Sequence, residues 1–406
     1  MTTNLQTSCC IAGGGPAGMM LGFLLARSGL DVIVLEKHGD FLRDFRGDTI
    51  HPSTLELMYE LGLLDEFLKR PHQRMTELGG QVAGEMLKIA DFTHLPTHCK
   101  FLALMPQWDF LNFIAEQARQ YKGFRLLMKA EAVDIIEVNG RVTGVKAKTE
   151  DGPIEIRALL TVGADGRRST LRERAGLRVL DLGAPMDVLW LRISRKPTDP
   201  PQTFGHAEPG KIFVMLDREQ YWQCGFVIAK GGFEQIRSKG IEAFREDVAG
   251  MQPFLRDRVG EIANWNSVSV LTVKVDRLKQ WWRPGLLCIG DAAHAMSPVG
   301  GVGINLAIQD AVAAANILSD RLAAGRVSEG DLEAIQERRE FPTRATQKLQ
   351  IAIQNRIIRR VLASSQPFSV PWILRLMQRW PWLRRIPARI VGVGFRPEHI
   401  HTPERT

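Results

Sequence analysis

The sequence predicts an α/β fold in which a domain of alternating strands and helices is interrupted by a β-rich insertion and followed by a helical C-terminal segment. Apolar, strand-like runs lead straight into glycine-rich turns and helices near both ends of the first 320 residues. Residues 180–277 read mainly as strands, and residues 331–362 have helical periodicity with mixed charge. A chain of 406 residues with 45% hydrophobic content is long enough for two or three domains with buried cores.

The first glycine-rich turn follows a strand-like run at 8–11 and precedes a helix-like run at 19–27. In a Rossmann-like unit, Gly13 permits the tight turn, Gly15 lets the backbone approach a pyrophosphate, and Gly18 permits close packing of helix on strand. A second strand at 31–35 ends at Glu36, where an acid can bind a ribose diol. The pattern therefore predicts a dinucleotide site, with further contacts from Pro16, Ala17 and Lys37.

A second glycine-rich stretch follows the apolar run 286–289 and leads into a helical pattern over 304–318. Its glycines let the backbone approach a flat ligand, and the N–H groups that open the helix favour an anionic edge. Together with the first turn, this loop indicates bound FAD. Its candidate cofactor-binding residues are Gly290, Asp291, Pro298, Gly300, Gly301, Val302, Gly303, Ile304 and Asn305.

Between these two lies a third motif, Asp165-Gly166, at the end of the strand-like run 158–162. The order of the three motifs resembles that of the FAD-dependent aromatic hydroxylases, the para-hydroxybenzoate hydroxylase-like class A flavoprotein monooxygenases, which include ubiquinone-biosynthesis hydroxylases. The resemblance covers roughly residues 7–320 and is specific at the three motifs. It implies a Rossmann-like FAD-binding domain with an inserted β-rich substrate domain.

The resemblance also implies roles for individual residues. Gly13, Gly15 and Gly18 would hold the FAD pyrophosphate and Glu36 the adenosine ribose. Asp291 would contact the ribityl or pyrophosphate region, Asp165 would serve both FAD and the pyridine nucleotide, and Gly300 to Gly303 would approach the isoalloxazine. Arg46 is similar to the arginine of the flavin-contact loop and Gln107 to a residue that clamps the cofactor, although either could be an ordinary surface residue.

The implied activity is hydroxylation of an aromatic, quinone-like or polyketide-like molecule with NADH or NADPH and molecular oxygen, through a flavin C4a-hydroperoxide. A flavin-dependent halogenase and a geranylgeranyl-type reductase are the alternatives on the same fold. The catalytic candidate is Tyr221, on a strand over 221–228, with a sheet-surface role as the alternative. Alternation places Tyr221, Gln223 and Gly225 on one face and Trp222, Cys224 and Phe226 on the other, and leaves open which face meets the flavin.

The expected organisation is interleaved. The FAD-binding domain takes residues 1–75, 107–179 and 278–330, the substrate domain 76–106 and 180–277, and the helical segment 331–406. Five scattered cysteines show no metal spacing and argue against a disulfide scaffold, so we expect a reducing, cytoplasmic compartment, no signal peptide and no metal. His94 and His98 are spaced like metal ligands, but Pro96 lies between them and a third ligand is missing.

The net charge of +8 fits attraction of anionic nucleotides, and no basic motif with stacking residues indicates a nucleic-acid partner. The segment 371–385 combines tryptophans with arginines. It is either a helical cap on the FAD-binding domain, as Pro371, Pro381 and the nearby Pro387 favour, or a surface that contacts a membrane interface. A monomer or a homodimer is compatible with the sequence.

Overall fold

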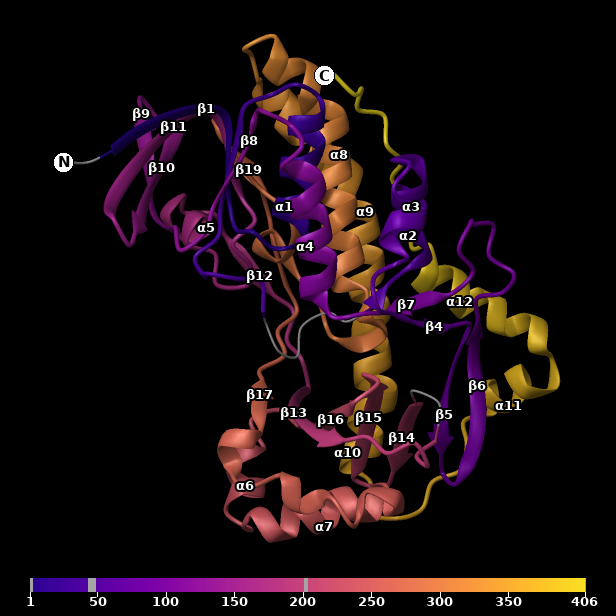
Figure 1. Cartoon of the computed structure of the whole chain (residues 1–406). Coiled ribbons are helices and arrows are strands. Elements are labelled where there is room, and N and C mark those ends of the chain that lie inside the picture. The colour runs from indigo at the N-terminus through magenta and orange to yellow at the C-terminus, as the bar shows by residue number, and fades with distance from the viewer. Residues whose placement is uncertain (1–2, 43–48, 201–203, 406) are drawn as a thin grey trace.

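The structure is a computed structural model that describes residues 3–42, 49–200 and 204–405 (Figure 1). Its first sheet is built on five neighbouring parallel strands, and antiparallel strands extend it. In sheet order the main strands are β19 (Trp282–Arg283), β20 (Leu286–Cys288), β11 (Gly152–Gly163), β1 (Thr3–Ala12), β2 (Val32–Leu35) and β8 (Phe124–Leu127); β10 (Arg141–Thr149) pairs with β11, and β9 (Glu131–Val138) with β10.

Both faces of the first sheet are covered, because its central strands are apolar on both sides. Cys9 and Ile11 of β1 point to one face, and Cys10 and Ala12 to the other. The first face packs against α1 (Pro16–Arg27), α4 (Gln107–Ala118) and α8 (Gly303–Ala323), and the second against β10 and α5 (Thr170–Arg174). Among the described helices, only the stretch Val299–Ala323 is long and apolar enough to cross a membrane by composition, and 67% of its apolar window is buried in this core.

Two small three-stranded sheets lie where the chain leaves and re-enters the first sheet. One consists of β3 (Thr49–Ile50), β7 (Leu102–Leu104) and β4 (Gln73–Met75), beside α2 (Pro52–Glu60) and α3 (Leu64–Phe67). The other consists of β12 (Val179–Asp181), β18 (Asp276–Leu278) and β21 (His294–Ala295).

The second large sheet, at the bottom of Figure 1, combines strands from two separate stretches of the chain. Its order is β17 (Ser269–Leu271), β13 (Met186–Ser194), β16 (Tyr221–Ala229), β15 (Lys211–Asp217), β14 (Phe204–Glu208), β5 (Glu77–Val82) and β6 (Glu85–Asp91). One face packs on α7 (Ile241–Met251), which follows α6 (Phe233–Arg237), and on 3₁₀ turns at Pro253–Leu255, Val259–Glu261 and Trp265–Ser267.

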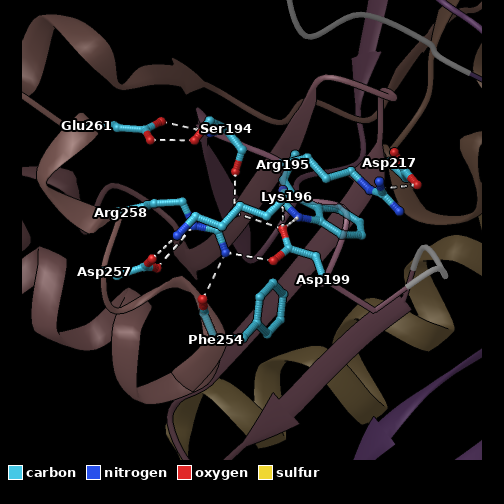
Figure 2. Close-up of polar contacts among 10 residues, drawn as sticks. Ser194, Arg195, Lys196, Asp199, Asp217, Phe254, Asp257, Arg258 and Glu261 are labelled. Atoms are coloured by element: carbon cyan, nitrogen blue, oxygen red, sulfur yellow. Dashed lines mark hydrogen bonds and ion pairs between the residues drawn. The ribbon is translucent and has the colours of Figure 1, made fainter.

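A buried ion pair fixes the far end of this sheet (Figure 2). The Arg258 guanidinium donates to both carboxylate oxygens of Asp199, each at 2.8 Å, and the Trp222 indole N–H donates to Asp199 at 2.8 Å. Arg258 also donates to the carbonyls of Ser194 and Phe254. Although burial opposes its charge, these hydrogen bonds lower the pKa of Asp199 to about 2. The loop after β13 is thereby tied to the turns that follow α7.

The C-terminal part begins with one long helix that connects the two large sheets. α9 (Glu329–Ile353), a π-helical turn (Gln354–Ile358) and α10 (Arg359–Ala363) run from α8 beside the first sheet to β15 of the second (Figure 1). Ser328 starts α9 with a capping box to Asp331. The chain then crosses to β6, which it covers with α11 (Trp372–Arg379), a 3₁₀ turn (Pro381–Arg384) and α12 (Arg385–Gly392).

Candidate FAD site

The three glycine motifs meet because their strands are neighbours and end in register. Ala12 of β1 pairs with Leu35 of β2 and with Gly163 of β11, and Gly163 pairs with Cys288 of β20. All four strands are parallel, so the segments that follow them leave the same edge of the sheet. That edge therefore gathers the first glycine turn, Glu36, the Asp-Gly motif and the Gly-Asp motif.

The first glycine turn contains positions that the protein needs as glycine and one that it does not. Gly13 has φ +110°, and a Cβ there would lie 2.3 Å from the Ala164 carbonyl oxygen of the Asp-Gly motif. A Cβ on Gly18 would lie 1.9 Å from the Gly13 carbonyl oxygen. Gly15, which caps α1 before Pro16, has φ −77°, and a Cβ there meets no other described heavy atom within 4 Å. The open space beside Gly15 is thus available to a ligand at the N-terminus of α1.

Glu36 supports this turn from the end of β2. It is buried, and its two carboxylate oxygens accept from the backbone N–H of Gly14 at 3.2 Å and of His38 at 2.9 Å. Lys37 beside it is exposed. The position fits the expected ribose contact, but the hydrogen bonds present show Glu36 holding the shape of the loop.

Asp165 holds the start of α5. Its carboxylate accepts from the Ser169 hydroxyl at 2.5 Å and from the Leu171 N–H at 3.2 Å. Burial raises the pKa of Asp165, although these hydrogen bonds act in the opposite direction. Gly166 follows with φ +84° and turns the chain toward Arg167.

Arg167 joins the Asp-Gly motif to the Gly-Asp motif, a link that the sequence analysis did not anticipate. Its Nε donates to Asp291 at 3.0 Å, and its Nη2 donates to the Met296 carbonyl at 3.3 Å. The remaining nitrogen, Nη1, is buried without a hydrogen-bond partner among the described residues. The only sequence signal was an arginine directly after Asp-Gly, whose partner lies 124 positions away.

Behind the Gly-Asp motif lies a buried network on Asp310. Gly290 is wedged between α1 and α8, where a Cβ would lie 3.2 Å from Ala17 and 3.1 Å from Ala307. Its N–H donates to Asp310, which also accepts from His294 and from the Arg339 guanidinium. Burial would raise the pKa of Asp310, but these two cationic or donor partners outweigh it and lower that pKa. The His294 ring therefore hydrogen-bonds to the buried Asp310 carboxylate behind the Gly-Asp motif.

The glycine loop before α8 is fastened to the segment at 49–54 by Asn305. The Asn305 amide oxygen accepts from the His51 N–H at 2.9 Å and the Thr54 hydroxyl at 2.8 Å, and its amide N–H₂ donates to the carbonyls of Thr49 and Gly301. A Cβ on Gly301 would lie 2.3 Å from the Thr49 hydroxyl. The Asn305 side chain is thus fully used by the protein, which leaves backbone groups of the loop for a ligand.

The other predicted cofactor-binding residues of this loop form its turn and connect it to α8. Gly300 and Gly301 have φ +80° and +62°, conformations that favour glycine. Gly303 begins α8. Pro298 and Val302 flank the turn between them, and Ile304 is buried at the start of the helix.

His51 points an unsatisfied nitrogen toward this loop. Its Nδ1 lies 2.7 Å from the Val391 carbonyl, which can only accept, so Nδ1 carries the proton. Burial lowers the pKa of His51 to about 4 against the opposing effect of that hydrogen bond. The ring is therefore neutral at pH 7, and Nε2 is an acceptor. Nε2 is buried, lies 3.6 Å from the Cβ position of Gly301, and has no hydrogen-bond partner among the described residues.

The remaining predicted residues are placed unevenly. Gln107 is the buried first residue of α4. Arg46 lies outside the described residues. Tyr221 starts β16, and the Arg192 guanidinium lies over its ring, 4.8 Å from the ring centroid. Tyr221 is six positions from Val227, which packs in the cluster that contains Val299 of the glycine loop. Tyr221 thus lies toward the opposite end of β16 from the residue that packs near that loop.

The structure does answer which face of β16 looks toward the loop. Trp222, Cys224 and Phe226 are buried in the cluster under α7. On the opposite face, Val227 packs with Val188 and Trp190 in the cluster that contains Val299. The face of Tyr221, Gln223 and Gly225 is consequently the inner face.

No group of three histidine, cysteine or acidic side chains in the described part of the chain could hold a metal ion. His94 lies near Asp91 and Arg385, whereas His98 contacts Glu56. The two histidines that have ligand-like spacing thus have separate partners.

These features fit FAD. The open position at Gly15 beside a helix N-terminus suits a pyrophosphate, the spare Arg167 nitrogen suits an anionic or hydroxyl oxygen, and the spare His51 acceptor suits a donor such as a flavin N–H or a ribityl hydroxyl. The three lie around one sheet edge and the loop that faces it.

Comparison with known proteins agrees with this geometry. Residues 6–349 match the family model described as FAD binding domain. The 6-methylpretetramide 4-monooxygenase of Streptomyces rimosus is 31% identical over 390 residues, which cover 95% of this chain and 92% of that protein. Four further curated relatives match 74–76% of the chain, but they are longer, and the chain spans 60–64% of their lengths.

Solved structures share the fold at lower identity. PqsL of Pseudomonas aeruginosa, in complex with 2-aminobenzoylacetate, has a TM-score of 0.76 at 21% identity, over 88% of this chain and 98% of that one. The myxobacterial chondrochloren halogenase CndH has a TM-score of 0.74 at 19% identity, over 95% of this chain and 90% of that one. The fold alone therefore does not separate monooxygenases from halogenases. With a family match over most of its length and a monooxygenase relative above 30% identity along nearly the whole of both chains, the protein belongs to the FAD-binding family of FAD-dependent monooxygenases.

Proposed function

We propose that the protein hydroxylates an aromatic or polyketide-like small molecule, with FAD as cofactor and NADH or NADPH and molecular oxygen as co-substrates. The observation that carries the proposal is the meeting of three glycine motifs at one edge of parallel strands, with open space at Gly15. The similarity to a protein named 6-methylpretetramide 4-monooxygenase supports a polyketide-like substrate.

When bound, FAD accepts hydride from the nicotinamide and passes electrons to oxygen, chemistry that no side chain supplies. The chain has to bind and orient it. We assign the pyrophosphate to the turn Gly13 to Gly15 and the first N–H groups of α1, and the adenosine ribose to Glu36. The isoalloxazine would lie against the loop Pro298 to Gly303, where the N-terminus of α8 favours negative charge on the reduced ring.

His51 and Arg167 would hold the cofactor from the side of the protein interior. Arg167 is positioned by Asp291, so a charge-neutralised pair presents the free Nη1 donor to the cofactor. His51 is positioned by the Val391 carbonyl and presents an acceptor. Both would therefore contact polar groups of the cofactor without adding a net charge to the site.

The inner face of the second sheet would cover the substrate and exclude water, which the oxygen chemistry requires. Apolar side chains of this face pack against Val299 of the glycine loop before α8. Tyr221 remains the predicted catalytic residue, although its place at the outer end of β16 favours Gln223 and Gly225 as closer neighbours of the substrate.

We also propose the domain division 1–75, 107–179 and 278–330 for FAD, and 76–106 and 180–277 for substrate. The entry of β5 and β6 into the second sheet supports it. A cytoplasmic location is proposed from five buried, free cysteines.

The test is incorporation of labelled oxygen. Purified holoprotein is reduced anaerobically with NADH or NADPH in the presence of phenols and polycyclic aromatic polyketides, and is then mixed with ¹⁸O₂. We expect a substrate that accelerates flavin reduction to gain one ¹⁸O atom. Reduction without incorporation of label would overturn the hydroxylase proposal in favour of a reductase, and halide-dependent product formation would favour a halogenase.

A further inference from the structure

The segment 366–394 has an unusual surface. It contains five arginines and no aspartate, glutamate or lysine. It also holds every exposed tryptophan among the described residues: Trp372, Trp380 and Trp382 are 74%, 47% and 58% exposed. Ile373 and Ile386 add exposed aliphatic area on the same elements.

The inner side of this segment is well anchored, so the exposed side is not a consequence of loose packing. Met377 of α11 is buried on β6, and Ala388 of α12 lies in a core cluster with Phe92 and Leu95. The Gln378 amide pairs with the backbone N–H and C=O of Lys88 at 3.2 and 2.7 Å, as a neighbouring strand would. α11 and α12 therefore hold a fixed orientation at the outer edge of the molecule (Figure 1).

The outer side is divided into an apolar and a cationic stripe. On α11, Trp372 and Leu376 are four positions apart and lie on one stripe, and Arg375 and Arg379 form the adjacent one. Trp380 follows directly after the helix. The following turn and α12 continue both chemistries, with Trp382 and Ile386 beside Arg389, which is exposed. Tryptophan at the headgroup level and arginine toward anionic lipid is the arrangement of helices that lie in a membrane interface.

We propose that α11, the turn after it and α12 form a docking surface for an anionic membrane, on which the protein lies peripherally. Charge complementarity carries this choice, because the segment contributes five arginines and no acidic residue of its own, which suits a lipid headgroup layer of one sign. A second copy of this chain that docked through the same segment would bring arginine against arginine without matched acids. The inference goes beyond the proposed function and does not depend on it.

The experiment is co-sedimentation of the holoprotein with phosphatidylcholine vesicles that contain or lack phosphatidylglycerol. Wild type should bind the anionic vesicles, weakly or not at all the neutral ones, and less at high salt. Replacement of three exposed arginines in Arg375→Gln/Arg379→Gln/Arg389→Gln should weaken binding on the order of 100-fold, at roughly one factor of five per charge. Trp372→Ala/Trp380→Ala should also lower binding at unchanged charge.

The matched control removes the same charge elsewhere. Lys122, Lys148 and Lys239 are exposed and distant in sequence from the segment. The triple change Lys122→Gln/Lys148→Gln/Lys239→Gln should leave vesicle binding within a few-fold of wild type. All variants alter exposed side chains, so FAD content and melting temperature should match wild type and verify folding.

Three results would overturn the proposal. One is absence of binding to anionic vesicles, and another is an equal loss in the lysine control, which would mean that net charge alone attracts the protein. The third is a wild-type dimer, measured by sedimentation equilibrium, that Trp372→Ala/Trp380→Ala dissociates, because the surface would then be an interface between two copies.

Discussion

Replacing Gly15 with alanine separates the requirements of the fold from those of the cofactor. Gly15 has φ −77° and ψ −177°, a conformation open to any residue, and its Cβ would meet no other described heavy atom within 4 Å. Alanine is a poorer N-cap than glycine by about 0.5–1 kcal/mol, and it lowers the entropy of the unfolded chain by about 0.4–1 kcal/mol. The two nearly cancel, so the apoprotein should melt at the wild-type temperature.

FAD affinity should respond quite differently. The new methyl group would occupy the space through which the pyrophosphate reaches the N–H groups at the start of α1. Each charge-assisted hydrogen bond lost costs about 1.5–3 kcal/mol, which corresponds to about 10- to 150-fold weaker binding. A Gly15→Ala preparation should therefore be pale and regain its yellow colour only at high added FAD.

The assay titrates apoprotein with FAD by fluorescence quenching and records melting of the apoprotein by circular dichroism. Gly250→Ala is the matched control, because Gly250 lies in α7, far from the turn, and its Cβ also meets open space. It should bind FAD normally and be slightly stabilised, by about 0.5–1 kcal/mol. Wild-type FAD affinity in Gly15→Ala would refute the placement of the pyrophosphate, and a collapse of apoprotein stability would show that Gly15 serves the fold.

Three further predictions concern single positions. Gly18→Ala should prevent stable folding, because its Cβ would lie 1.9 Å from the Gly13 carbonyl oxygen, and soluble, wild-type-like apoprotein would contradict this. His51→Gln should retain more FAD affinity than His51→Leu, since glutamine can present an acceptor. Because the folded pKa of His51 is about 4 and histidine titrates near ~6.5 when unfolded, wild type should lose up to about 3 kcal/mol of stability as the pH falls through that window, and His51→Gln should not. Asp199, with a folded pKa of about 2, contributes stability above its unfolded value near ~3.9 that is lost as the pH falls toward 2, so melts of Asp199→Asn should lack that decline.

The sequence predicted local features well because they depend on neighbours in the chain. The strand before each glycine motif and the helix after it are present, and the register of β1, β11 and β20 explains why motifs about 125 to 280 residues apart meet at one sheet edge. Two helical stretches are interrupted, between α2 and α3 at Gly62 with φ +71° and between α6 and α7 at Gly240 with φ +89°, where a left-handed residue ends one helix and the chain turns into the next.

What the sequence could not provide are pairings between distant side chains. The bond of Arg167 to Asp291 depends on how two loops face each other, and the choice of inner face on β16 depends on where α7 packs. Within the β-rich stretch 180–277, residues 268–275 are mostly irregular, and Ser269–Leu271 alone of them pair with β13. The predicted roles of Glu36 and Asp165 remain predictions, since their oxygens already hold the loops that carry them.

The acceptor that fixes the ring of His51 is a main-chain atom, the carbonyl of Val391 near the end of α12. Because a substitution at position 391 changes only the side chain, the carbonyl remains, and the tautomer of His51 does not depend on which residue stands there. It is sensitive instead to where the helix lies: a shift of α12 by one ångström would lengthen the hydrogen bond beyond its useful range. The outer side of that helix carries Ile386 and Arg389. A surface contact that moved α12 would therefore change the hydrogen bond that fixes which nitrogen of His51 carries the proton, beside the glycine loop.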